Sequence, residues 1–148
     1  MGSARAVPAI ASDPRKAFME FHPWFPAFDS ARTQADALEV FVDASLDIMA
    51  RIGLLAAVVT TAAAGDPQMR AAATLGEQRR VDGYGLIVEL LAKKGKLRRG
   101  VSVRKATDIL LAILSAETYE HLALRREWSP TELRKWTLDV LRHQLLPT

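Results

Sequence analysis

Apolar and polar positions alternate with the period of a helix from Thr33 onward. Apolar side chains recur at spacings of three and four residues as far as Ile52, which is the pattern of an amphipathic helix with one buried face. The opposite face carries acidic side chains, which we expect to point into solvent: Asp36, Glu39, Asp43 and Asp47. Gly53 is expected to end or bend this helix before a second apolar stretch, 54–64.

A second long helix is predicted from Asp66 to about Lys94. Asp66 can accept amide protons as an N-cap, Pro67 suits the first helical position, and Gly95 is a typical helix end. Each interior glycine lowers intrinsic helix stability by about 1 kcal/mol relative to alanine. We therefore expect the glycines of this helix to mark close packing or the wall of a cavity: Gly76, Gly83 and Gly85.

The last third of the chain predicts two more helices. Ser102 is the N-cap candidate of the first, and Ser129-Pro130-Thr131-Glu132 has the pattern of a capping box at the start of the second. Both helices carry apolar residues on more than one side, so each is expected to be buried on two sides. No strand pattern or internal repeat competes, and the sequence predicts an all-α bundle of five to six helices.

Residues 1–32 form an irregular segment rich in proline and aromatic residues. Asp13-Pro14 is a helix-start signal within it, and the prolines beyond Phe21 should break or kink the helix that starts there. The aromatic cluster is too apolar for a solvated leader, so we expect it to pack on the domain formed by residues 33–148: Phe18, Phe21, Trp24, Phe25 and Phe28.

Composition narrows the class of protein. The chain has 148 residues and no cysteine, which excludes thiol nucleophiles and cysteine zinc sites and fits a reducing compartment, so a cytoplasmic location is expected. The net charge of +3 is too small to demand a nucleic-acid partner. The longest apolar stretch, 52–64, is shorter than the roughly 20 residues of a membrane span, so we expect no membrane partner.

Catalytic and metal chemistry is not predicted. The sequence contains no nucleophile elbow, zinc-protease, phosphate-loop or dinucleotide motif. His22, His121 and His143 do not share a metal-ligand spacing. We therefore expect no enzyme activity, no catalytic residue, no bound metal and no cofactor.

A run of basic side chains surrounds the end of the second long helix: Lys93, Lys94, Lys96, Arg98, Arg99, Arg104 and Lys105. Phosphate contact is one interpretation, because such residues neutralise nucleic acids. The favoured interpretation is structural, because basic residues at a helix C-terminus interact well with its dipole and no aromatic residue within the run offers a base-stacking platform.

Several short motifs follow one another after Lys94: Gly95-Lys96-Leu97-Arg98-Arg99-Gly100, Ala106-Thr107-Asp108-Ile109-Leu110, Ser115-Ala116-Glu117-Thr118-Tyr119, Glu127-Trp128-Ser129-Pro130, Trp136 and Leu145-Leu146-Pro147. In this order and spacing the segment resembles the C-terminal effector-binding and dimerisation domain of bacterial TetR-family transcriptional regulators. Upstream, Gly65-Asp66-Pro67 at the start of a long helix also fits.

The resemblance implies a regulator that lacks its DNA-binding head. In that family an N-terminal helix-turn-helix domain binds DNA, and the prolines before Thr33 leave no candidate for it here. DNA contact is then expected only through a helix-turn-helix domain missing from this chain.

The same resemblance implies a homodimer whose last two helices pair with their copies in a four-helix interface. The residues expected near this contact are Leu111, Ser115, Tyr119, Trp136, Val140 and His143. The alternative for each residue is an ordinary position in the core of one subunit.

An effector pocket is implied inside each subunit, between the helices that precede the dimer pair. Its expected lining residues are Trp24, Phe25, Phe28, Phe41, Ser45, Met49, Tyr84 and Ile87. Ser45, Tyr84 and His22 supply polar groups among apolar neighbours, as ligand sites require. For each residue taken alone, an ordinary core position is the stronger interpretation.

The function expected from these features is an effector-binding and dimerisation domain that senses a small apolar molecule. The alternative is a headless helical homodimer that acts as a protein-interaction module, which a filled core without a cavity would favour. A basic nucleic-acid-binding module ranks third.

Overall fold

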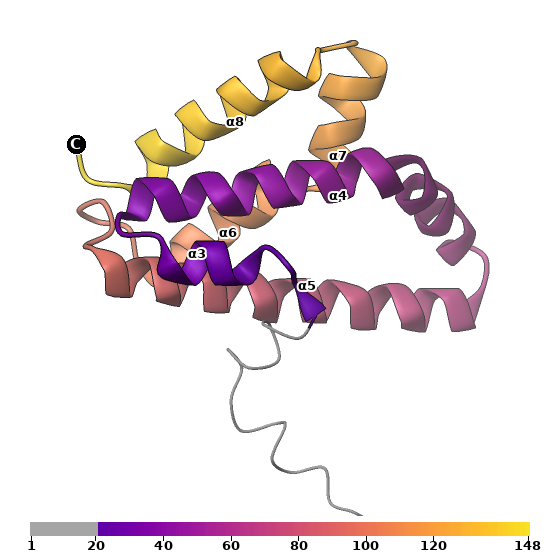
Figure 1. The fold of residues 1–148 in the computed structure, drawn as a ribbon. Helices are drawn as coiled ribbons and strands as arrows, with labels where there is room; N and C mark the ends of the chain where they lie inside the picture. Colours follow the sequence, from indigo (N-terminus) through magenta and orange to yellow (C-terminus); the bar gives the residue numbers. More distant parts are fainter. Residues whose placement is uncertain (1–20) are drawn as a thin grey trace, which may run out of the picture.

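Helices form all the regular secondary structure in the described part of this computed structural model, residues 21–148. These are α3 (Phe25–Ser30), α4 (Gln34–Ala63), α5 (Pro67–Lys94), α6 (Val103–Ile113), α7 (Ala116–Tyr119), the π-helix η1 (Glu120–Arg125) and α8 (Pro130–Leu145) (Figure 1). The predicted all-α fold of five to six helices is confirmed. The helix-start signal Asp13-Pro14 lies outside the described residues.

Side-chain caps fix the predicted helix starts. The Asp66 carboxylate accepts from the Gln68 amide at 2.8 Å, and the Ser102 hydroxyl accepts from the Lys105 amide at 3.1 Å. The Ser129 hydroxyl accepts from the amide of Glu132, also at 3.1 Å. Each cap satisfies an amide that has no partner within its own helix, which explains why these boundaries are readable from sequence.

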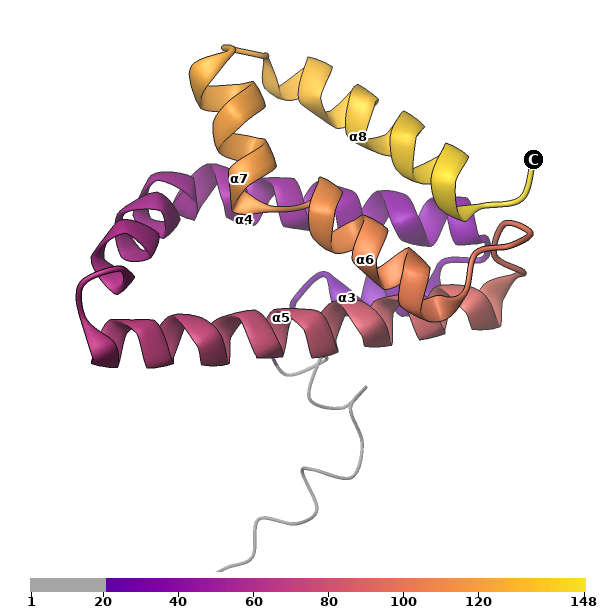
Figure 2. The ribbon, with the colours of Figure 1, turned by 180° about the vertical axis from the view of Figure 1, so that it is seen from behind.

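Two long helices set the shape of the molecule. The α4 and α5 helices run antiparallel as a hairpin, with α3 on one side of it and α6 on the other (Figures 1 and 2). After α6 the chain rises through α7 and η1 and returns as α8, which packs on α4 and α6. The C-terminal helices therefore complete the bundle at the end of the hairpin where α4 begins.

Gly53 is expected to end or bend its helix, and it does not end it, because α4 continues without interruption to Ala63. The second half of α4 curves toward α5 (Figure 2). Gly53 is buried, and a Cβ added there would lie 3.1 Å from ring atoms of Tyr119. The missing side chain lets α7 approach α4 closely.

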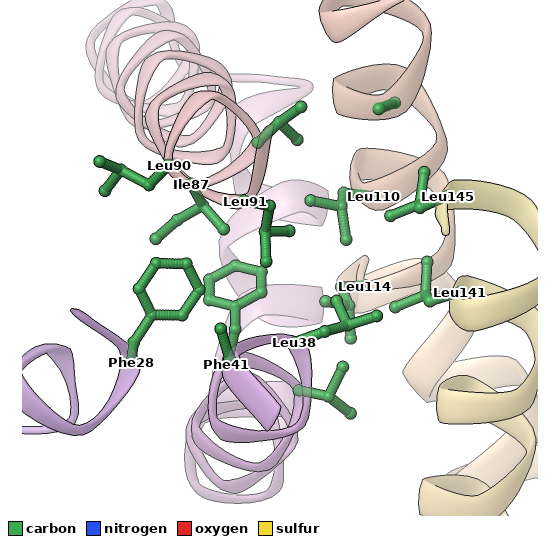
Figure 3. Packing of buried hydrophobic residues seen from close by; sticks show 14 of the residues in the cluster. Phe28, Leu38, Phe41, Ile87, Leu90, Leu91, Leu110, Leu114, Leu141 and Leu145 are labelled. Carbon is green, nitrogen blue, oxygen red and sulfur yellow. The ribbon is translucent and has the colours of Figure 1, made fainter. Parts of the chain in front are cut away.

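The core lies at the end of the hairpin where α4 begins and α5 ends. Side chains from five helices point toward one another there (Figure 3), including Phe28, Leu38, Phe41, Ile87, Leu91, Leu110, Leu114, Leu141 and Leu145. The aromatic cluster contributes Phe25 and Phe28, both without exposed surface, whereas Phe21 is 73% exposed and Phe18 lies outside the described residues. The packing prediction therefore holds for Phe25 and Phe28 and is wrong for Phe21. The segment is also not irregular throughout, because Phe25–Ser30 form α3, in which Pro26 occupies the first turn, where a helix needs no amide donor. In α5 every buried residue comes after Leu86.

The acidic face of α4 is not simply solvated, contrary to the prediction. Arg134 of α8 places its Nε 2.5 Å from Asp43 Oδ1 and its Nη2 2.6 Å from Glu39 Oε1. Arg142, two turns further along α8, lies 3.4 Å from Glu39. These pairs are partly exposed, so each contributes modestly, but together they fix α8 against α4.

Two members of the basic run have structural contacts. The Lys94 ammonium donates to the carbonyls of Asp29 and Ala31 at 2.8 and 2.7 Å, which ties α5 to the end of α3. The backbone amide of Arg98 donates to the Leu145 carbonyl at 2.7 Å. These contacts support the structural interpretation of the run.

Two glycines are expected to respond in opposite directions to alanine. A Cβ at Gly95 would lie 2.9 Å from the Gln34 amide group, which caps α5 by donating to the carbonyls of Leu91 and Gly95. Gly95→Ala should therefore lower the free energy of unfolding by about 1 to 2 kcal/mol through lost hydrogen bonds. At Gly76 a Cβ meets nothing within 4 Å, so Gly76→Ala should raise it by about 1 kcal/mol through helix propensity.

Urea unfolding of both variants measures these changes. Equal stability of Gly95→Ala and the parent chain would show that Gln34 does not hold the end of α5.

Candidate functional site

A cavity of about 1140 Å³ lies where α4 and α5 diverge, bounded by α6 and by the residues just before α3. This volume is slightly larger than the usual range of small-molecule sites, about 300 to 1000 Å³. Its lining consists of His22, Trp24, Phe41, Ser45, Ile48, Met49, Ile52, Gly53, Arg79, Arg80, Val81, Asp82, Gly83, Tyr84, Gly85, Leu86, Ile87, Glu89, Arg104, Thr107, Asp108 and Ala116.

Aromatic rings form one side of the cavity. Trp24 and Phe41 meet edge to face with ring centroids 5.4 Å apart, and Phe41 meets Tyr84 in the same way at 5.2 Å. His22 lies against Trp24 at 5.4 Å, and burial lowers the pKa of its imidazole, which favours the neutral ring. The contacts hold three large rings in fixed orientations, so this side is preformed.

Backbone without side chains forms part of the cavity wall that α5 provides. Gly83 and Gly85 flank Tyr84 on α5, and both line the cavity. A Cβ built on Gly85 meets nothing within 4 Å, so open space lies in front of this residue. The sequence-based expectation of a cavity wall fits these two glycines, whereas Gly76 lies outside the lining.

A polar cluster links the cavity to the end of α6, and we call it the Arg80 cluster: Ser45, Arg80, Tyr84 and the carbonyls of Leu111 and Leu114. Arg80 Nη2 donates to both carbonyls at 2.6 Å. The Tyr84 hydroxyl donates to the Leu114 carbonyl at 3.2 Å, and the Arg80 guanidinium lies 4.9 Å from the Tyr84 ring centroid. These donors satisfy carbonyls that a helix C-terminus leaves without partners.

The Tyr84 hydroxyl stays protonated in this environment. Burial raises the pKa of Tyr84 above its usual value, while the charge of Arg80 and the donors of Arg80 and Ser45 at the phenol oxygen act in the opposite direction. Burial is the larger effect because it penalises the phenolate. Tyr84 therefore presents a neutral hydroxyl at neutral pH.

The charged residues of the lining fall into two groups. Arg79, Asp82, Glu89, Arg104 and Asp108 are exposed and form what we call the cavity rim. Their charges are of mixed sign and screened by solvent. The Arg80 side chain, by contrast, keeps only 25% of its surface accessible to solvent.

Most of the expected ligand residues surround this one cavity: Trp24, Phe41, Ser45, Met49, Tyr84 and Ile87. Phe25 and Phe28 do not line it, so the prediction is wrong for these two residues. Both rings are fully buried and stack on each other with centroids 5.9 Å apart. The turn before α3 directs Trp24 to the cavity and the next aromatic residues to the core.

Sequence reasoning missed several lining residues. Ile48 and Ile52 continue the face of α4 that carries Ser45 and Met49, so the helical period could have found them. Thr107 gave no such signal, because α6 approaches the cavity only through tertiary packing. Arg80 gave none either. The role of Arg80 depends on carbonyls more than thirty positions later in the chain.

The residues expected at a dimer contact fall into two groups, those that keep accessible surface and those that make contacts within the chain. Leu111, Trp136 and Val140 are half-buried and His143 is exposed. Ser115 is buried at the start of α7, where its hydroxyl accepts from the Thr118 amide and donates to the Ala112 carbonyl. Tyr119 packs its ring on Gly53. The last two therefore serve contacts within the subunit.

No group of acidic or histidine side chains within residues 21–148 is arranged to hold a metal ion. In the same part of the chain, no helix combines the length and apolar character that crossing a membrane requires.

Tyr84 should give the chain a specific alkaline sensitivity. Because its pKa is raised by folding, the unfolded chain loses the proton first as the pH rises past about 10, and stability then falls. Tyr84→Phe should cost about 1 kcal/mol at pH 8 through the lost hydrogen bond, yet lose less stability between pH 9 and 11. Urea unfolding across this range measures both effects.

Tyr119→Phe is the matched control, because it retains the Tyr84 hydroxyl and should keep the alkaline loss. Parallel stability curves for the parent chain and Tyr84→Phe would contradict the assigned burial effect.

Comparison of the chain with models of protein families, with curated proteins and with solved structures finds no match.

Proposed function

We propose that this chain binds a small apolar molecule in the cavity between α4, α5 and α6, as the effector-binding and dimerisation domain of a TetR-like transcriptional regulator. The observation that carries the proposal is the cavity itself, about 1140 Å³ in volume and with a mostly apolar surface. A preformed apolar cavity with a few polar groups is the usual form of a small-molecule site.

The arrangement of the Arg80 cluster supports a sensing role. It joins the cavity to the end of α6, from which α7, η1 and α8 continue. A ligand can shift a conformational equilibrium only if it prefers one conformation, and contacts at the Arg80 cluster could supply such a preference. In this proposal DNA is contacted by a separate helix-turn-helix domain, and the protein acts in the cytoplasm.

The proposal includes a homodimer formed through α6 and α8. Leu111, Trp136 and Val140 keep part of their apolar surface accessible, and apolar residues accessible on neighbouring helices suit a self-complementary interface.

A protein-interaction module is the second candidate, and one surface favours it. Apolar side chains are exposed along the second half of α4, where Leu54 is 72% and Val58 64% exposed. Large exposed apolar surfaces commonly mark sites of protein contact. The protein-interaction function is favoured if no small molecule binds in the cavity.

A thermal-shift screen against apolar metabolites and drugs tests the first candidate. A ligand that binds only the folded chain stabilises it by about 2.7 kcal/mol at one hundred times its dissociation constant. Gly85→Leu should abolish the ligand-induced shift, because its side chain fills open space in the cavity, without lowering the melting temperature of the free protein.

Gly76→Leu is the matched control, since it adds the same side chain to α5 outside the cavity and should keep the shift. A broad screen without any stabilising compound, or compounds that stabilise Gly85→Leu as well as the parent chain, would contradict binding in this cavity.

The dimer is tested by adding charge to its proposed contact. Leu111→Glu combined with Val140→Glu should convert the dimer to monomers, because two buried carboxylates in each subunit would lose hydration at the interface. Multi-angle light scattering measures the molar mass. Asp139→Glu on the exposed side of α8 is the control, and an unchanged dimer in the double variant would place the interface elsewhere.

A further inference from the structure

The cavity has one charged side chain set within its wall. Arg80 keeps 25% of its side-chain surface accessible, whereas the charged residues of the cavity rim are exposed. The carboxylate nearest to Arg80 belongs to Glu77, at 3.3 Å, and 60% of its surface is accessible. The positive charge of Arg80 is therefore only weakly compensated where it meets the apolar space.

Contacts on several sides hold the guanidinium in place. One nitrogen donates to the Leu111 and Leu114 carbonyls, and the Tyr84 ring covers one face. A second nitrogen, Nη1, donates to the two carboxylate oxygens of Glu77 at 3.3 and 3.4 Å. A guanidinium presents five donors in a rigid planar arrangement, so an incoming anion can bind at Nε or replace the exposed Glu77 carboxylate at Nη1. Fixed donors bind an incoming anion at a lower entropic cost than mobile ones.

Hydroxyl groups next to Arg80 extend the same polar end. The neutral Tyr84 hydroxyl donates to the Leu114 carbonyl at 3.2 Å, and Ser45 lies 8% exposed on α4. Ile48, Met49 and Ile52 continue from Ser45 as an apolar surface along α4. The cavity thus has one cationic, hydrogen-bonding end and an apolar remainder.

We infer that the ligand is an amphipathic acid, with its carboxylate at Arg80 beside the Tyr84 and Ser45 hydroxyls and its apolar body along Ile48, Met49 and Ile52. This inference rests on the proposed function and adds the chemical class of the effector. A carboxylate forms charge-assisted hydrogen bonds with a guanidinium, which are stronger than neutral ones. An ammonium group at the same place is repelled, and an alcohol gains no ion pair.

Probes that differ only in their head group test the inference. N-Phenyl-1-naphthylamine, a neutral fluorescent apolar molecule, reports occupation of the cavity, and decanoate, 1-decanol and decylamine compete with it below their solubility limits. Decanoate should displace the fluorophore at a roughly tenfold lower concentration than 1-decanol or decylamine, as expected for one charge-assisted contact.

Variants at neighbouring arginines locate the effect. Arg80→Gln should remove the advantage of decanoate and leave displacement by 1-decanol within about threefold of the parent chain. Arg80→Lys should retain a preference for the acid because it keeps the charge. Arg79→Gln is the matched control, since Arg79 belongs to the exposed cavity rim, and it should behave like the parent chain.

Failure of the inference differs from failure of the proposed function. Equal displacement by all three probes, or loss of the acid preference in Arg79→Gln instead of Arg80→Gln, would overturn the inference while binding in the cavity remains. If neither the fluorophore nor decanoate binds, or if both bind Gly85→Leu as well as the parent chain, both proposals are wrong. Should Arg80→Gln fail to fold by circular dichroism, the head-group series on the parent chain and on Arg80→Lys decides.

Discussion

The two hydrogen bonds from Arg80 to the end of α6 fix the point at which the chain leaves the long hairpin for its C-terminal helices. A helix end exposes carbonyls that need donors, and here α5 supplies them to Leu111 and Leu114. The chain changes direction at this point and begins α7, η1 and α8. The bonds therefore join the long hairpin to the later helices and simultaneously set the polar end of the cavity.

The sequence predicts the helices well because their signals are local. Asp66, Ser102 and Ser129 cap the amides two or three residues later, so each helix start is contained in a few consecutive residues. Gly53 is the instructive exception, because its role depends on Tyr119, which only the folded chain brings near. A glycine can mark a close contact as readily as a helix end.

The site could be predicted only as far as it follows one helix face. The period of α4 leads from Phe41 through Ser45 to Met49, and these residues do line the cavity. The separation of Trp24 from Phe25 and Phe28 depends on a turn whose direction the sequence does not specify. The contacts of Glu39 and Asp43 with Arg134 likewise join residues far apart in the chain. In the sequence, acidic residues that pair with another helix have the same spacing as acidic residues on a solvated helix face.

Gly83 and Gly85, which form part of the cavity wall, separate the shape of the cavity from the stability of the core. The core residues Val88 and Leu91 lie about one and two turns beyond Gly85 and are fully buried, so the packing that stabilises the bundle does not depend on the side chain at position 85. Single substitutions there can reshape the cavity while the core stays intact. The family of sequences compatible with this fold thus includes many pocket shapes, and a change of ligand is accessible through small steps that each leave a folded protein.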